Sequence, residues 1–93
     1  MKFNRESAVE KARIDLAERT GAGADEIETI SVDETDFPDM SLGAPATDEM
    51  SAQMISTGWR INLRTGGRDF EYRADKYQLR LYNFDGANYV IES

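Results

Sequence analysis

The side chains of this chain that could do chemistry are carboxylates and hydroxyls. Histidine and cysteine are both absent from the 93 residues, which excludes a His-dependent triad, thiolate catalysis, disulfides and metal sites built on Cys or His. Acid–base catalysis by two carboxylates needs one of them to be desolvated. The closely spaced acidic pairs are Asp33/Glu34, Asp36/Asp39 and Asp48/Glu49. Nothing in their surroundings indicates desolvation, so we predict no catalytic residue.

Metal binding and covalent catalysis receive little support from the remaining patterns. A calcium loop places oxygen ligands at close alternating positions around a glycine, whereas Asp33, Asp36 and Asp39 recur every three residues without that glycine. Ser41 and Ser56 are possible nucleophiles, but no motif pairs them with a lysine. We therefore predict no metal site and no cofactor. An enzyme that uses carboxylates or a divalent cation remains an alternative function.

The charge is unevenly distributed. The net charge is −7, and no Lys or Arg lies between Arg19 and Arg60. Binding to nucleic acid or to an anionic membrane requires basic surface, so we expect neither partner. A basic protein or a cation fits this charge better, although a solvated acidic face would also explain it. The acidic residues of the stretch are Asp25, Glu26, Glu28, Asp33, Glu34, Asp36, Asp39, Asp48 and Glu49.

The length predicts one domain over residues 1–93, and the pattern of its elements, described below, makes it an α+β domain. No apolar stretch approaches the roughly 20 residues that a membrane helix needs. Met1–Leu16 is charged and has a helical pattern, without the apolar segment and cleavage site of a signal peptide. We therefore expect a cytoplasmic location.

The first element that must position these groups is a helix over Asn4–Thr20. Ser7 and Glu10 fit a capping box, with Asn4 as a competing N-cap, and Gly21 ends the helix. One face of this helix is apolar and should pack on the rest of the domain. That face carries Val9, Ala12 and Leu16, with Ala8 beside them.

Strands follow. Glu26–Asp36 alternates as a strand that Phe37-Pro38 ends. Gly66-Gly67 separates two alternating runs, which is typical of a two-residue hairpin. In the resulting register Trp59 faces Ala74 and every apolar residue meets an apolar partner. The other pairs are Ile61/Tyr72, Leu63/Phe70, Asn62/Glu71, Arg64/Asp69, Thr65/Arg68 and the like-charge pair Arg60/Arg73.

The chain ends with two further strands. Tyr77–Leu81 alternates, Asp85-Gly86 marks a turn, and Tyr89–Ile91 can form a short edge strand. We therefore predict an N-terminal helix packed on a four- to five-stranded antiparallel meander, a cystatin-like shape. The expected core consists of Val9, Ala12, Leu16, Trp59, Ile61, Leu63, Phe70, Tyr72, Leu79 and Leu81.

The segment between Phe37 and Gln53 is unusually apolar for a connection. Exposed loops seldom carry so many apolar groups unless these cover or bind something. Two interpretations remain open: Leu42 and Met50 cover an open end of the core, or the loop is a peptide- or ligand-binding lip beside Trp59. For the second interpretation, the candidate binding residues are Asp39, Ser41, Leu42, Gly43, Pro45, Gln53 and Trp59.

The same segment carries a resemblance. Phe37-Pro38-Asp39-Met40-Ser41-Leu42-Gly43-Ala44-Pro45, Ala52-Gln53, Gly58-Trp59-Arg60-Ile61 and Phe70-Glu71-Tyr72 are similar to a small bacterial family of unassigned function. The pattern of that family is (W/F)PDxSLGxP, AQ, G(Y/W)xI and (Y/F)xY, and the similarity covers residues 8–75. Phe37 stands here for a tryptophan, Ala44 for a frequent cysteine, and Thr47-Asp48 for Pro-Gly. The resemblance implies a small α+β domain and supplies no activity.

These observations favour a non-enzymatic binding or interaction module that uses the loop over residues 38–53. Its partner would be a protein or peptide. A purely structural or oligomerising domain is a further alternative, because Tyr89, Val90 and Ile91 could form an edge strand able to pair with a second copy. We expect a monomer or a weak homodimer.

Overall fold

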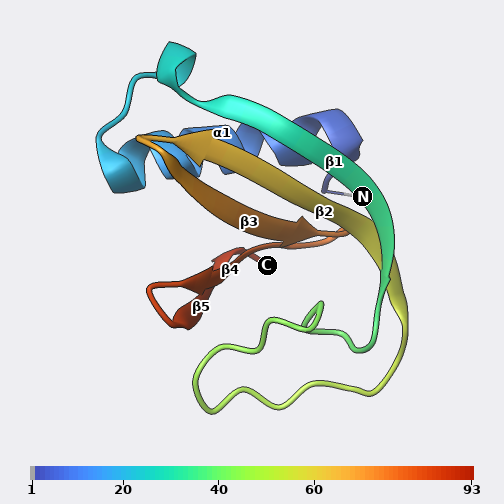
Figure 1. The fold of residues 1–93 in the computed structure, drawn as a ribbon. Coiled ribbons are helices and arrows are strands. Elements are labelled where there is room, and N and C mark those ends of the chain that lie inside the picture. Colours follow the sequence, from blue (N-terminus) through green and yellow to red (C-terminus); the bar gives the residue numbers. More distant parts are fainter. Residues whose placement is uncertain (1) are drawn as a thin grey trace.

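The computed structural model describes residues 2–93, which form one helix, one short 3₁₀ helix and five strands (Figure 1). No helix in this range is both long enough and apolar enough to cross a membrane. The elements are α1 (Arg5–Thr20), η1 (Ala24–Glu26), β1 (Glu28–Phe37), β2 (Ser56–Thr65), β3 (Arg68–Ala74), β4 (Leu79–Phe84) and β5 (Ala87–Glu92).

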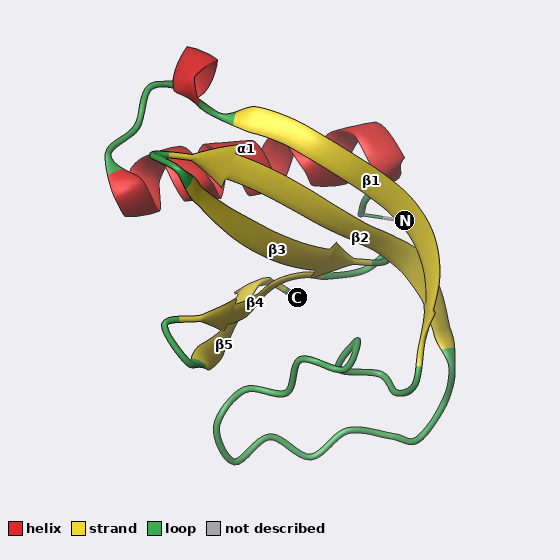
Figure 2. Ribbon diagram, in the orientation of Figure 1, coloured by secondary structure: helices red, strands yellow, loops and turns green. Residues whose placement is uncertain are grey.

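The five strands make one antiparallel sheet in the order β1-β2-β3-β4-β5, so each strand pairs with its neighbours in sequence. α1 crosses one face of this sheet (Figure 2). The fold is therefore α+β with a meander sheet, as the sequence predicts. Residues 38–55 form the long loop between β1 and β2, which runs beside the β4–β5 hairpin in Figure 1.

The helix begins at a different cap from the capping box that the sequence suggests. Asn4 is the N-cap: its side chain accepts a hydrogen bond from the Ser7 backbone N–H at 2.8 Å, and Ser7 Oγ accepts one from the Asn4 N–H at 3.0 Å. The prediction of a capping box between Ser7 and Glu10 is wrong. Ser7 is instead the N3 residue of the capping box that begins at Asn4. The left-handed Gly21 ends the helix as expected, with φ +77°.

The first strand also differs in detail. The sequence predicts Glu26–Asp36, whereas β1 covers Glu28–Phe37, and Glu26 belongs to η1. The ladder with β2 shifts register between Thr29 and Ser31, so Ile30 lies at a β-bulge and its side chain is exposed. A bulge inserts one extra residue into the strand and shifts the alternation by one position. A pattern search with a strict period of two does not predict this shift.

The β2–β3 hairpin has the predicted register throughout, from Trp59/Ala74 to Thr65/Arg68. Its one unfavourable pair, Arg60 opposite Arg73, is relieved by Glu71. The Glu71 carboxylate lies 2.7 Å from Arg73 Nε and 3.3 Å from Arg60 Nε. A single acidic side chain between two guanidinium groups thus removes most of the repulsion.

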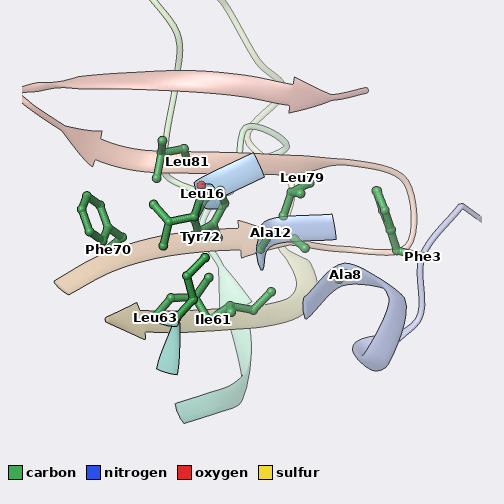
Figure 3. Packing of buried hydrophobic residues seen from close by; sticks show 12 residues of the cluster. Phe3, Ala8, Ala12, Leu16, Ile61, Leu63, Phe70, Tyr72, Leu79 and Leu81 are labelled. Carbon is green, nitrogen blue, oxygen red and sulfur yellow. The ribbon is translucent and has the colours of Figure 1, made fainter. Parts of the chain in front are cut away.

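The core lies between α1 and the sheet, where apolar side chains from both layers point toward one another (Figure 3). The Tyr72 hydroxyl is satisfied there, because it donates to Asp15 Oδ2 at 2.7 Å. Most of the predicted core is confirmed, but Val9 and Trp59 are only partly buried at its margin. The buried members are Phe3, Ala8, Ala12, Leu16, Ile27, Ile61, Leu63, Phe70, Tyr72, Ala74, Leu79 and Leu81.

The prediction that Tyr77 begins the fourth strand is wrong, since β4 starts at Leu79. The buried Asp75 carboxylate accepts hydrogen bonds from the backbone N–H groups of Tyr77 at 2.8 Å and Gln78 at 3.0 Å. This Asx-type turn takes Tyr77 out of the alternation and leaves its side chain exposed.

Gly58 offers a sharp test of how closely β2 and β3 approach. A Cβ at this position would lie 1.9 Å from the Ala74 carbonyl oxygen, so Gly58→Ala must separate two backbones. We expect this change to cost about 3 kcal/mol or more of unfolding free energy, measured by urea denaturation. Gly66→Ala is the control. Its Cβ would meet no atom within 4 Å, although φ is +60°, so it should cost only about 1 kcal/mol. Equal losses for the two variants would contradict the close approach.

Candidate functional site

The face of the sheet opposite α1 is covered by the loop over residues 38–55. Two arginines that lie opposite each other in the β3–β4 ladder, Arg73 and Arg80, reach from the sheet to this loop. We call them the arginine clamp. Phe37, Leu42 and Ala44 are buried on this side, outside the main core cluster.

Arg80 makes the stronger half of the clamp, with only 5% of its side chain exposed. Its guanidinium donates to both Glu49 carboxylate oxygens, one of them at 2.7 Å, and to the Ala44 carbonyl at 3.1 Å. Its Nε donates to Gln78 Oε1 at 2.7 Å. Bidentate pairing of this kind is strong and directional, and here it neutralises a buried charge.

Arg73 makes the other half. One of its nitrogens, Nη1, donates to the carbonyl oxygens of Leu42 at 3.0 Å and Gly43 at 3.1 Å. Its guanidinium carbon also lies 3.7 Å from the centre of the Tyr82 ring, a cation–π contact. A Cβ at Gly43 would lie 2.8 Å from Arg73 Nη1, so the close approach of this arginine depends on glycine.

The segment that Arg73 binds is a turn built around Asp39. The Asp39 carboxylate accepts hydrogen bonds from Ser41 Oγ at 2.6 Å, from the Ser41 N–H at 2.9 Å and from the Gly43 N–H at 3.1 Å. The hydrogen bond from the Ser41 hydroxyl is the main cause that lowers the pKa of Asp39. Leu42 follows with φ +60°, a conformation that an aliphatic residue seldom adopts, and its side chain is fully buried.

Next to the clamp lies an open cavity of about 470 Å³, within the usual range for ligand sites. Three parts of the fold meet there. They are the long loop, which contributes both of its ends, the β1–β2 pair, and the turn between β3 and β4. Its lining consists of Glu34, Met40, Met54, Ile55, Ser56, Thr57, Gly58, Trp59, Asp75, Lys76 and Tyr77.

Hydrogen bonds hold the walls of this cavity in place. Met40 donates its N–H to the Ala52 carbonyl at 3.0 Å, and its own carbonyl accepts from Gln78 Nε2 at 2.7 Å. Ser56 Oγ donates to the Met40 sulfur at 3.2 Å. Because Gln78 also accepts from Arg80, the clamp and the cavity wall belong to one hydrogen-bonded network. The cavity is therefore preformed.

The rim of the cavity is apolar and open to water. Met54, Ile55 and Tyr77 are exposed to 62%, 74% and 63%, and Met40 is also exposed. Such side chains gathered around one hollow gain free energy when another apolar group covers them. Trp59 lies half-buried at its base. The arrangement can hold an apolar side chain, and the charged residues of its lining are Glu34, Asp75 and Lys76.

The structure does not bring the seven predicted binding residues together in one site. Ser41 and Leu42 are fully buried, and Asp39 and Gly43 belong to the turn beneath Arg73. Trp59 lines the cavity. The remaining two are exposed: Pro45, whose carbonyl accepts from Asn88, and Gln53. That these residues bind a ligand stays a prediction.

The two interpretations of the apolar loop residues have separate outcomes. The Leu42 side chain is fully buried between the loop and the sheet, as a covering residue would be. Met50 is 96% exposed and covers nothing. Ile55 and Tyr77 line the cavity but are not among the residues predicted from the sequence. The available signal was that Met54-Ile55 is an apolar pair directly before a strand, and that Asp75-Lys76 begins a turn next to Tyr77.

The two serines considered as nucleophiles make hydrogen bonds within the fold. Ser41 Oγ donates to Asp39, and Ser56 Oγ donates to Met40. Within residues 2–93 no three acidic side chains come together as a metal site would require.

The Glu49–Arg80 pair predicts a specific pH dependence of stability. Its hydrogen bonds with Arg80 lower the pKa of Glu49 from 4.5 to about 2, against the opposing effect of burial. A lowered pKa in the folded state stabilises above the unfolded value, and this stabilisation is lost as the pH falls from about 4.5 toward about 2. Glu49→Gln should therefore lower the free energy of unfolding by about 2 kcal/mol at neutral pH.

The measurement is urea unfolding of wild type and Glu49→Gln across this pH range. The difference between the two proteins should shrink as the pH falls from about 5 to about 2. Glu10→Gln, on the exposed side of α1, is the control and should show no such convergence. A difference that is constant with pH would contradict the assignment.

Comparison with known proteins identifies a family and no relative of known activity. No curated protein and no solved structure matches the chain. One family model does match, over residues 9–81, which includes α1 from Val9, the whole loop and the cavity-lining turn. The chain therefore belongs to the family described as Domain of unknown function (DUF8738).

Proposed function

We propose that this chain is a small non-enzymatic domain that binds a protein or peptide partner through the cavity beside Trp59. The observation that carries the proposal is the gathering of exposed Met54, Ile55 and Tyr77 around one preformed hollow. Soluble proteins rarely leave such side chains together in water unless they contact a partner.

The order of the walls supports binding rather than incomplete packing. The backbone of Met40 is fixed on both sides, and the turn before Tyr77 is held by Asp75. A preformed site loses little conformational entropy when it is occupied, so more of the contact free energy appears as affinity. The methionines add adaptable apolar surface at the rim.

The surrounding charge indicates which partners fit. Between Arg19 and Arg60 the chain carries acidic residues and no Lys or Arg, and Glu34 of this stretch lines the cavity. A partner with basic groups around its apolar anchor gains from this potential, whereas nucleic acid and anionic lipid are repelled by it.

The test is selection of random peptides displayed on phage against the immobilised domain. Selected peptides should carry an apolar residue, and their affinity should fall about tenfold or more for the double variant Ile55→Ser/Tyr77→Ser. Both side chains are mostly exposed, so the variant should keep the unfolding midpoint of the wild type.

Ile14→Ser is the matched control, because Ile14 is 47% exposed on α1 and does not line this cavity. It should leave peptide binding unchanged. Trp59, the single tryptophan, supplies an independent signal, since an occupied cavity should shift its fluorescence. Failure to select any peptide, or equal affinity for the double variant and the wild type, would refute the proposal.

A further inference from the structure

We propose that the partner is an extended basic segment that adds as a strand to the outer edge of β1 and places one apolar side chain in the cavity. This inference rests on the proposed function and adds the conformation and charge of the ligand.

β1 is an edge strand of 10 residues. It pairs with β2 on one side, and no other strand within residues 2–93 pairs with its outer side, which is the outermost edge of the sheet in Figure 1. An edge of this length presents backbone N–H and C=O groups to an incoming strand. Addition of a peptide strand to such an edge is a common mode of recognition.

One residue of this edge strand lines the cavity. Glu34 belongs to β1 and lines the cavity, and it lies directly opposite Trp59 in the β1–β2 ladder. Residues opposite one another in a sheet point to the same face. The residue of an added strand that pairs with Glu34 would therefore point to the face of Glu34 and Trp59, at the border of the cavity. One alternate side chain of the ligand is thus aimed at the apolar rim.

The charges along the edge disfavour a second copy of this chain as the occupant. Asp33, Glu34 and Asp36 are exposed on β1. If two copies of β1 paired antiparallel with the two-fold axis at Glu34, the Glu34 side chains of the two copies would lie opposite each other. If the axis lay between Asp33 and Glu34, Asp33 of one copy would lie opposite Glu34 of the other. Like charges directly opposite are unfavourable in a sheet.

The same charges favour a basic strand. A lysine opposite Asp33 or Asp36 would form a cross-strand pair of opposite charge. At the Val32 end of this stretch, Arg5 Nη2 donates to the Val32 carbonyl oxygen at 3.4 Å, a contact that the added strand would replace. The outer edge of β1 therefore favours a basic strand over a second copy of β1.

The probe is a fluorescein-labelled peptide with the core Lys-Thr-Leu-Lys-Val, written to pair antiparallel with Asp36 through Val32, so that its leucine faces Glu34. Binding to the full chain is followed by fluorescence anisotropy. Replacing both lysines by glutamate should weaken binding about tenfold or more. Only every second amide of the added strand would donate to β1. Methylating those nitrogens should abolish binding, whereas methylating the intervening nitrogens should leave it unchanged.

Protein variants separate the parts of the argument. Asp33→Lys should weaken binding of the peptide, and Glu10→Lys, an equal change of charge on exposed α1, should have a much smaller effect. Ile55→Ser reports on the cavity alone.

Loss of binding with Ile55→Ser but indifference to N-methylation and to lysine replacement would overturn strand addition and leave the proposed function standing. Binding that responds to N-methylation but is indifferent to Ile55→Ser would overturn the role of the cavity in both proposals. A parent peptide that fails to bind would refute the inference about the ligand, while the phage selection still decides the proposed function.

Discussion

The structure depends on the neutralisation of one guanidinium group that is removed from water. Arginine stays charged at any pH that a protein tolerates, so a buried arginine must be paired. Arg80 meets this requirement by binding Glu49, the Ala44 carbonyl and Gln78. Glu49 and Ala44 lie in the loop, and Gln78 also donates to the Met40 carbonyl in the cavity wall. One charge therefore orders the loop and the cavity wall together.

The two faces of the sheet are consequently stabilised by different physics. The α1 face buries a continuous apolar cluster, whereas the loop face combines a few buried apolar residues with arginines that bind backbone carbonyls. Hydrophobic burial tolerates small displacements, but hydrogen bonds to a guanidinium require defined positions. The loop can therefore be held in one conformation without regular secondary structure, and the cavity beside it keeps its shape.

The sheet was predictable from the sequence and the loop was not, for a physical reason. Alternation around Gly66-Gly67 determines the β2–β3 register, because a shift by one residue would expose every apolar side chain of the hairpin. Arg73 and Arg80 occupy polar positions of the same alternation, which are typical of a solvent-facing surface. Three of their acceptors in the loop are backbone carbonyls, which every residue possesses, and Glu49 lies 31 positions before Arg80, so no local side-chain pattern indicates that a loop covers them. The cavity was found only in part, through Trp59, because Tyr77 reaches it by a turn that interrupts the strand pattern.

The meander order has a consequence for the kinetics of folding. β2, β3, β4 and β5 are joined by short turns, and such local pairings form quickly because little chain entropy is lost in closing them. β1 pairs with β2 only across the loop over residues 38–55, and the clamp joins residues that are 30 to 36 positions apart. The β2–β5 meander should consequently assemble before the loop docks, and the clamp contacts would be largely absent from the transition state. Interactions of that kind act on the unfolding rate, so the arginines govern how long the native molecule persists rather than how fast it forms.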